Sequence, residues 1–286
     1  MADTRIAAVF RSREYSPNHI GTDAAILNDV CDQLRKRGCA VDTFTEESLI
    51  SNIPAKPLDY DAWLTMARAP KTIKLLQQFE SMGALVINSA FGIENCRRER
   101  MSTILAGNGI PLADFIITDT DAAVLNRLKK ENYSNCWVKQ ADGHSKHKED
   151  VSFVRNPEEA QEILQEYFMR GIRRAVICRH LSGDLIRFYG VEGTDFFKWF
   201  MPMDDRHFSP DTVDLDTHPA LLDANRLKTI CSSAAEALDV KIYGGDCILL
   251  PDGQLVLIDI NDWPSFAPCR KAAASFIARF LLKTIK

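Results

Sequence analysis

Two patterns of apolar residues alternate along the first ninety positions. Short apolar runs typical of buried strands are separated by segments whose apolar residues have the three- and four-residue spacing of an amphipathic helix. The strand-like runs are 5–10, 40–44, 62–66 and 84–87, and the helical segments are 22–37 and 72–82. Strands that alternate with helices predict a mainly parallel sheet, so this region has the pattern of a βαβ layer in an α/β protein.

The loops that follow the first and third predicted strands carry polar side chains. In a parallel sheet, ligands bind beyond the carboxyl ends of the strands. Arg13, Asn18 and Arg68 lie in these loops and are candidates for substrate contact. Loops that only contact solvent have the same polar composition. Each of these residues is therefore equally well explained as a surface side chain without a role in binding.

From position 112 the pattern changes to that of a smaller α+β unit. Strands are expected at 115–118, 136–139, 151–154 and 174–178, helices at 121–130 and 158–170, and a helix at 96–106 precedes the unit. The remaining chain predicts a strand at 184–189, a helix at 221–238 and a terminal helix at 270–286.

A hairpin is predicted near the C-terminus. The apolar segments 242–250 and 254–260 are separated by Pro251-Asp252-Gly253, and Asp-Gly is a strong signal for a two-residue hairpin loop. Pairing of Pro251 with Gln254 across that loop places Asp246 directly opposite Asp259. Asn261, two residues beyond Asp259, points to the same face.

Two carboxylates and an amide oxygen on one face of a hairpin predict a cation site. Like charges that face each other destabilise a sheet. Oxygen ligands suit a hard cation, and Mg²⁺ fits best, with Mn²⁺ as an alternative. A solvent-facing hairpin whose acids only maintain solubility is the other interpretation. The apolar residues Ile248, Leu250, Val256 and Ile258 disfavour it, because they indicate strands buried on both faces.

The composition narrows the class of protein. The chain has 286 residues, 46% of them apolar and 26% charged, which fits two or three subdomains of a soluble globular enzyme. The net charge of −4 gives no reason to expect nucleic acid or an anionic membrane as a partner. No segment has the apolar length of a membrane span or a signal peptide, so a cytoplasmic location is expected. The eight cysteines are scattered without a C-x-x-C pair, which favours reduced, mostly buried thiols.

The predicted hairpin resembles a motif of a known family. A Gly-x-Asp strand, a turn, and a strand that ends in acidic-x-Asn-x-x-Pro are similar to the metal-binding hairpin of ATP-grasp enzymes, in particular the RimK-type and D-alanine–D-alanine ligase-like branch. The two parts in this chain are Gly244-Gly245-Asp246 and Asp259-Ile260-Asn261-Asp262-Trp263-Pro264. The family usually has Glu at the position of Asp259, so the shorter side chain keeps the charge and reduces its reach.

The resemblance implies an ATP-grasp fold, of mixed α/β and α+β class, over nearly the whole chain. Its parts would be an N-terminal parallel βαβ (pre-ATP-grasp) domain at 1–94, a nucleotide-covering α+β subdomain with its leading helix at 95–178, and a C-terminal subdomain with the metal-binding hairpin at 179–286. No G-x-G-x-x-G sequence follows the first strand, so a dinucleotide fingerprint is absent there.

The resemblance also implies which residues contact phosphate. Lys139 ends an apolar strand and corresponds to the family's phosphate-contacting lysine, although a lysine that only protects a sheet edge is the alternative. Arg98, with Arg100 as the second choice, matches a basic residue on the preceding helix. Arg187 matches an arginine that points into the active site, where a guanidinium suits an acyl-phosphate and a tetrahedral intermediate.

Two nucleotide-binding segments depart from the family pattern. The hinge that usually reads the adenine, often with a Gln-Glu pair, and the glycine-rich loop near the phosphates both have other residues here. The loop has one glycine between 140 and 150, and side-chain donors there could replace backbone donors. The residues implied are Arg179, His180 and Leu181 for the hinge, and His144, Ser145 and Lys146 for the loop.

The activity that the resemblance implies is ATP-dependent ligation of a small-molecule or peptide carboxylate. The carboxylate would attack the γ-phosphate, and an amine or other nucleophile would capture the acyl-phosphate, with release of ADP and phosphate. Ser265 and Arg270 follow the Asn-x-x-Pro motif, where the acceptor pocket would lie, and Arg270 either holds a substrate carboxylate or contacts solvent. A homodimer is left open. The alternative is a divergent ATP-binding module without catalysis, which the glycine-poor loop favours and the paired acids and Lys139 disfavour.

Overall fold

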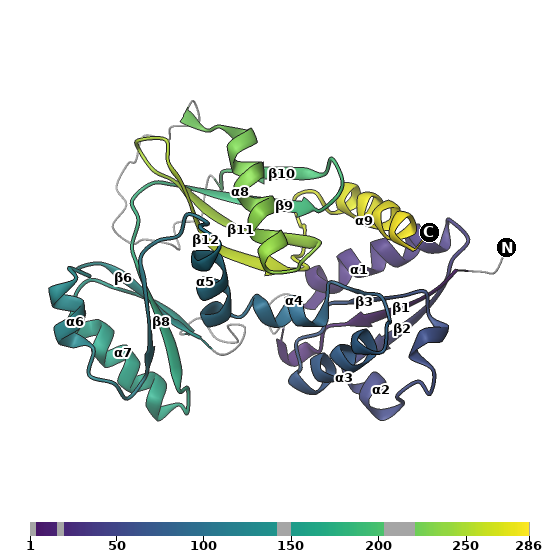
Figure 1. Ribbon diagram of the computed structural model, residues 1–286, viewed down its shortest axis with the longest axis horizontal. Helices are drawn as coiled ribbons and strands as arrows, with labels where there is room; N and C mark the ends of the chain where they lie inside the picture. Colours follow the sequence, from purple (N-terminus) through teal and green to yellow (C-terminus); the bar gives the residue numbers. More distant parts are fainter. Residues whose placement is uncertain (1–3, 16–19, 142–149, 203–220, 286) are drawn as a thin grey trace.

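The strands of the described residues form three four-stranded sheets (Figure 1). The computed structural model describes residues 4–15, 20–141, 150–202 and 221–285. The N-terminal sheet has the order β2-β1-β3-β4, the covering sheet β5-β8-β6-β7, and the hairpin sheet β10-β9-β11-β12. Their bounds are β1 (Arg5–Phe10), β2 (Ala40–Thr45), β3 (Ala62–Thr65), β4 (Val86–Ile87), β5 (Phe115–Asp119), β6 (Cys136–Gln140), β7 (Val151–Val154), β8 (Arg174–Arg179), β9 (Asp184–Val191), β10 (Phe197–Phe200), β11 (Ile242–Leu249) and β12 (Leu255–Asp262).

The N-terminal sheet is parallel throughout, which confirms the βαβ prediction. Ile6 and Ala8 on β1 belong to the core shared with two helices, whereas Ala7 and Val9 belong to the core on the opposite face. Burial on both faces explains the continuous apolar runs of these strands. The helices are α1 (Ile20–Arg35) and α9 (Arg270–Thr284) on the first side, and α2 (Glu46–Ser51) and α3 (Pro70–Ser81) on the second.

The C-terminal helix returns to the N-terminal sheet. Helix α9 lies beside α1 (Figure 1). Ala274 and Ile277 of α9 belong to the same buried cluster as Ile26 and Val30 of α1. The beginning and the end of the chain therefore stabilise one core.

The covering sheet is antiparallel and has helices on one face. Val138 and Ile177 face α6 (Leu125–Lys130) and α7 (Pro157–Met169), where they are fully buried. Side chains alternate along a strand, so Trp137 and Lys139 point to the other face. Both are only partly buried.

The hairpin sheet is also antiparallel, and α8 (Ala224–Ala237) covers one of its faces together with α5 (Arg98–Gly107). Phe188, Cys247 and Leu257 are buried on that side. The acidic residues of the hairpin alternate with the buried ones and therefore lie on the face away from α8.

Two helices occupy the region around the single helix predicted at 96–106. The first, α4 (Ala90–Asn95), begins at Ser89, whose hydroxyl accepts a hydrogen bond from the Gly92 N–H at 3.3 Å. Arg97 has extended backbone angles (φ −67°, ψ 136°) and separates α4 from α5. A Cβ on Gly92 would lie 2.1 Å from the Asp239 carbonyl oxygen, so glycine lets α4 pack on the connection after α8. The apolar patterns did not predict α4, α2 or β10.

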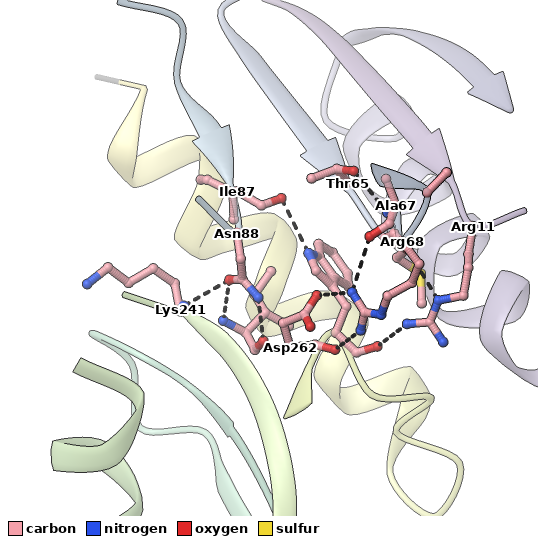
Figure 2. A network of polar contacts seen from close by, with 12 residues as sticks. Arg11, Thr65, Ala67, Arg68, Ile87, Asn88, Lys241 and Asp262 are labelled. Carbon is pink, nitrogen blue, oxygen red and sulfur yellow. Dashed lines mark hydrogen bonds and ion pairs between the residues drawn. The ribbon is translucent and has the colours of Figure 1, made fainter. Parts of the chain in front are cut away.

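A fully buried asparagine joins the N-terminal sheet to the start of β11 (Figure 2). The Asn88 Oδ1 accepts hydrogen bonds from the N–H groups of Lys241 and Ile242, each at 2.8 Å. Its Nδ2 donates to the Ile242 carbonyl at 2.7 Å. Because one amide group satisfies three backbone groups, it fixes the entry of β11 relative to β4.

A buried ion pair joins the N-terminal sheet to the end of β12 (Figure 2). The Arg68 Nη1 lies 2.5 Å from the Asp262 Oδ2, and its Nη2 donates to the Asp262 carbonyl at 3.0 Å. The Trp263 indole donates to the Ile87 carbonyl at 3.3 Å. The loop after β3 and the end of β4 thus hold the exit of β12, immediately after Asn261.

The cysteines have the state that their spacing predicts. All eight are free and six are buried. Burial raises the pKa of Cys136 and Cys247 to about 12, so both thiols remain protonated near neutral pH. Within the described ranges, no helix has the length and apolar character needed to cross a membrane.

Candidate active site

The hairpin loop has three residues, so the predicted two-residue loop is wrong. The Leu250 N–H donates to the Gln254 carbonyl at 2.8 Å, which leaves 251–253 as the loop. Pro251 has no N–H to donate to a partner strand and takes the first loop position instead. Gly253 closes the loop with a positive φ of 82°, a conformation that glycine adopts readily.

The pairing of Asp246 with Asp259 is nevertheless confirmed. On the loop side Cys247 pairs with Leu257, so Ile258 is an extra residue in β12. This bulge offsets the extra loop residue and restores the predicted register from Asp246 onward. Bulges are common beside active sites, where they re-aim side chains.

Gly245 is required because two strand backbones approach closely beside the acids. A Cβ on Gly245 would lie 2.1 Å from the Asp259 carbonyl oxygen. The neighbouring Gly244 would place its Cβ 2.8 Å from the Pro264 Cγ. The glycines thus allow the acidic strand end and the Asn-x-x-Pro exit to pack against β11.

We expect Gly245→Ala to destabilise the protein by about 3 kcal/mol or more, because backbone must move to admit the methyl group. Urea unfolding monitored by circular dichroism measures the change. Gly107→Ala at the end of α5 is the matched control, since no atom lies within 4 Å of its Cβ position. The control should change stability by less than about 1 kcal/mol. Equal stabilities for the two variants would contradict the close approach.

Four polar side chains from three adjacent strands lie on the face away from α8. Arg187 on β9 pairs in register with Asp246, and its Nε lies 3.4 Å from the Asp246 Oδ1. The Asn261 Nδ2 donates to the Asp259 Oδ2 at 3.1 Å. The Asp246 side chain is 22% exposed and that of Arg187 is 38% exposed, so both reach the surface of this face.

The surroundings of Asp246 disfavour its charge in the absence of a cation. Burial and the nearby Asp259 raise the pKa of Asp246 to about 6, and Arg187 and Lys139 oppose the increase. The carboxyl is therefore poised to gain stability from an added positive charge.

The stability of the metal-free protein should fall as the pH rises from about 4 to about 6. Over this range folded Asp246 retains a proton that the unfolded chain has released. Its ionisation therefore lowers the free energy of unfolding by about 3 kcal/mol above pH 7. Asp246→Asn should therefore raise the melting temperature at pH 8 and have little effect at pH 4. Melting curves over this pH range test it, with Asp121→Asn at an exposed position as the control. If the difference in melting temperature between Asp246→Asn and the parent is the same at every pH, this expectation is wrong.

Lys139 lies on the open face of the covering sheet, and its charge acts on Asp246. The same face carries Trp137 and Phe153, whose ring centroids are 5.0 Å apart. The Trp137 indole donates to the His180 Nδ1 at 3.1 Å. Burial lowers the pKa of His180, which keeps the imidazole neutral near pH 7. Lys139 is thus accompanied by an aromatic surface that ends at the predicted hinge.

Arg98, rather than Arg100, lies beside Lys139. The Arg98 Nη1 donates to the Gln140 carbonyl at 3.0 Å, which links α5 to the residue that follows Lys139. Arg100 instead donates to the Asn95 Oδ1 at 2.9 Å, at an exposed position. The structure therefore brings the first of the two predicted arginines to the end of β6.

The Arg179 side chain holds the covering sheet together. Its Nε donates to the Asp114 Oδ2 at 3.1 Å, its Nη1 to the Asn132 carbonyl at 2.8 Å and its Nη2 to the Glu131 carbonyl at 3.0 Å. The guanidinium also lies 4.6 Å from the Tyr133 ring centroid. These contacts occupy the Arg179 side chain. The N–H groups of Arg179 and His180 donate to the Asp114 and Asn135 carbonyls at 2.8 Å and 3.0 Å. Of the three predicted hinge residues, His180 and Leu181 are half-buried and keep side chains that a nucleotide could contact.

The predicted substrate residues are dispersed. Arg13 is exposed on a short 3-10 turn (Arg13–Tyr15), and Ser265 is half-buried after β12. Arg68 is 6% exposed and bound to Asp262, which does not fit substrate contact. Arg270 donates from Nε to the Asp29 Oδ2 at 3.1 Å and joins α9 to α1. Asn18, His144, Ser145 and Lys146 lie outside the described residues.

Sequence reasoning missed the acid that organises the loops of the N-terminal sheet. Glu46 is 2% exposed and accepts hydrogen bonds from the N–H groups of Ser12 at 2.9 Å, Arg68 at 3.1 Å and Ala69 at 2.8 Å. It fixes the loops that leave β1 and β3. The available signal was Thr45, which caps α2 in a capping box and places the acid in its first turn.

The donor set of the hairpin fits Mg²⁺. Asp246, Asp259 and Asn261 offer hard oxygen atoms, and burial together with the charge of Asp259 raises the pKa of Asp246, which an added cation would lower. Within the described ranges, no cluster of three or more His, Cys, Asp or Glu residues could hold a metal. A cation here would need ligands beyond the two acids and the amide, as is usual for Mg²⁺ at phosphate-binding sites.

Solved structures with a similar overall fold include ligases. D-alanine–D-alanine ligase from Bacillus anthracis complexed with ATP matches with a TM-score of 0.70 and 16% identity over 100% of this chain and 99% of that chain. The D-alanine–D-alanine ligase from Coxiella burnetii matches with a TM-score of 0.73 and 16% identity over 99% and 94%. ATP-grasp ligase PsnB complexed with minimal precursor matches with a TM-score of 0.65 and 15% identity over 98% and 99%. No protein-family model and no curated protein matches the sequence. The agreement over whole chains shows that this protein has the ATP-grasp fold.

Proposed function

We propose that this protein is an ATP- and Mg²⁺-dependent ligase that joins a carboxylate to an amine or another nucleophile, with release of ADP and phosphate. The observation that carries the proposal is the pair Asp246 and Asp259, which face each other beside Arg187. The charge of Lys139 reaches the same place from the covering sheet. Acids that would hold a metal and cations that would contact phosphates thus lie close together, on the hairpin sheet and the covering sheet.

The fold supports the same reaction class. Its relatives include ligases complexed with ATP and with a precursor peptide and AMPPNP. We therefore propose a small-molecule or peptide carboxylate as the first substrate. The second substrate is a nucleophilic acceptor that binds near Ser265, after the Asn-x-x-Pro exit.

The proposed residue roles follow from charge. Asp246, Asp259 and Asn261 would hold Mg²⁺, which reduces the repulsion between a carboxylate and a triphosphate. Lys139 and Arg98 would contact phosphate oxygens, and Arg187 would stabilise the negative charge of the acyl-phosphate. A substrate carboxylate oxygen bonds to the γ-phosphorus as the bond to ADP breaks. The acceptor then attacks the acyl carbon, loses its proton and expels phosphate.

The competing function is an ATP-binding module without catalysis. A protein that only binds ATP does not need Arg187 beside the acids, because the reacting carboxylate is the group that an arginine there would serve. We therefore favour the ligase.

Nucleotide product analysis tests the proposal. The protein would be incubated with ATP and Mg²⁺ against a panel of carboxylates and amines, with Asp259→Asn as the inactive control. We expect ADP and phosphate, with ¹⁸O transferred from the carboxylate to phosphate. AMP and pyrophosphate would refute the acyl-phosphate route. Tight ATP binding without turnover over the whole panel would favour the binding module.

A further inference from the structure

A cavity of about 320 Å³ lies at the edge of the hairpin sheet, away from the paired acids. Its walls are the turn that joins β9 to β10, two residues of α8, and Tyr243 on β11. Tyr243 alternates with Gly244 and packs in the core beneath α8, so the cavity opens on the sheet face opposite Asp246. The volume is at the lower end of the range for small-molecule sites.

Glu192, which lines the cavity, has one carboxylate oxygen without a partner. The Glu192 Oε2 is buried and accepts no hydrogen bond from any residue in the described ranges. Its negative charge contributes to raising the pKa of Tyr243, behind the larger effect of burial, so the two groups are close and the phenol stays protonated. The Tyr243 hydroxyl lies 3.3 Å from the Ser232 Oγ. A buried carboxylate oxygen without a donor is costly, so the Glu192 carboxylate that lines the cavity would gain from a ligand that donates hydrogen bonds to it.

A positive charge lines the same cavity. Lys228 lies one turn before Ser232 on α8, so both side chains face the cavity wall. Among the described residues, no ion pair joins Lys228 to Glu192 or to the exposed Asp195 at the rim. Opposite charges that share a cavity without touching leave space for a molecule that carries both complementary charges.

We propose that this cavity is a second ligand site, which binds a small zwitterion with one ammonium and one carboxylate group. The ammonium would donate to Glu192 and to the hydroxyl oxygens of Ser232 and Tyr243. The carboxylate would pair with Lys228. Charge-assisted hydrogen bonds of this kind are stronger than neutral ones, and they require both ends of the ligand.

Calorimetric titration of the protein without metal or nucleotide tests the proposal. The probes are glycine, β-alanine and 4-aminobutyrate, which separate the two charges by increasing lengths, and acetate and methylammonium, which each carry one charge. At constant ionic strength, at least one zwitterion should bind at least about tenfold more tightly than either single-charge probe. Equal or undetectable binding of all five probes would overturn the proposal.

Matched variants locate the binding. Glu192→Gln and Lys228→Met should each weaken binding by about tenfold or more, whereas the exposed controls Glu236→Gln and Lys283→Met should bind like the parent. Asp246→Asn should also bind like the parent, because its side chain lies on the other face of the sheet. Loss of binding in Asp246→Asn, with retention in Glu192→Gln, would place the ligand in the candidate active site and refute the second site.

A stability measurement separates a ligand-binding role from a structural one. Without ligand, Glu192→Gln should melt at the same temperature as the parent or higher, because it removes the charge from a carboxylate whose buried Oε2 has no hydrogen-bond partner among the described residues. A structural Glu192 would instead give a lower melting temperature, and that result would contradict the proposal. The measurements do not involve ATP turnover, so the proposal stands or fails independently of the ligase activity.

Discussion

Asp259→Asn is expected to lower kcat/KM for ligation by on the order of 10³-fold, about 4 kcal/mol of transition-state stabilisation, while the protein remains folded. The substitution removes one of two facing carboxylates and keeps the side-chain volume. Asn261 donates to the Asp259 Oδ2, and an amide at position 259 retains an oxygen that can accept this bond. Steady-state assays with saturating Mg²⁺ measure the loss, and circular dichroism confirms the fold.

The double variant distinguishes a shared metal site from two independent effects. If Asp246 and Asp259 hold one cation, the loss in Asp246→Asn/Asp259→Asn should be much smaller than the product of the single losses. Asp252→Asn in the exposed hairpin loop is the control and should retain parental activity. Unchanged turnover in Asp259→Asn would remove the basis for the metal assignment.

Arg68→Met is expected to destabilise the protein by about 3 to 5 kcal/mol. The Asp262 side chain is fully buried, and its Oδ1 already has no hydrogen-bond partner among the described residues. Without Arg68 the carboxylate would lose its ion pair as well, in a place that water does not reach. Chemical unfolding at pH 7 measures the change.

Two further variants show whether the loss of stability in Arg68→Met comes from the unpaired, buried carboxylate of Asp262. Arg68→Met/Asp262→Leu should recover most of the loss, because an apolar pair replaces both buried charges. Arg35→Met removes an ion pair whose partners are 46% and 63% exposed, and it should cost less than about 1 kcal/mol. If Arg68→Met behaves like Arg35→Met, the buried pair does not hold β12 in place.

In the N-terminal layer and the hairpin, residues close together in the chain were enough to predict strands and one cross-strand pair. The strand at 5–10 and that at 151–154 have the predicted bounds, because continuous or alternating apolar residues depend on nearby burial alone. The pairing of Asp246 with Asp259 was also predicted, although the predicted length of the hairpin loop was wrong. Two local irregularities, the third loop residue and the extra residue Ile258, cancel, and only the backbone hydrogen bonds reveal either of them.

The contacts of three arginines could not be predicted from neighbouring residues in the chain. Arg68, Arg179 and Arg270 occupy loop or hinge positions that sequence associates with ligands, yet each is engaged by a partner more than 45 residues away in the chain. An arginine has the same donors for a phosphate as for a carboxylate or carbonyl of the protein itself. Its sequence context cannot distinguish the two, because the choice depends on which acceptor the fold brings within reach.

Residue patterns along the chain were enough to predict the parallel N-terminal sheet, the pairing of Asp246 with Asp259, and the resemblance to the ATP-grasp fold. These features depend on periodicity and on short motifs, which are set by residues close together in the chain. Three other features became visible in the folded chain alone: α9 returns to the first sheet, Arg68 pairs with Asp262, and Glu192 and Lys228 line one cavity. Each of these contacts joins distant segments, so it arises from the packing of whole elements, and no local pattern specifies which side chains meet.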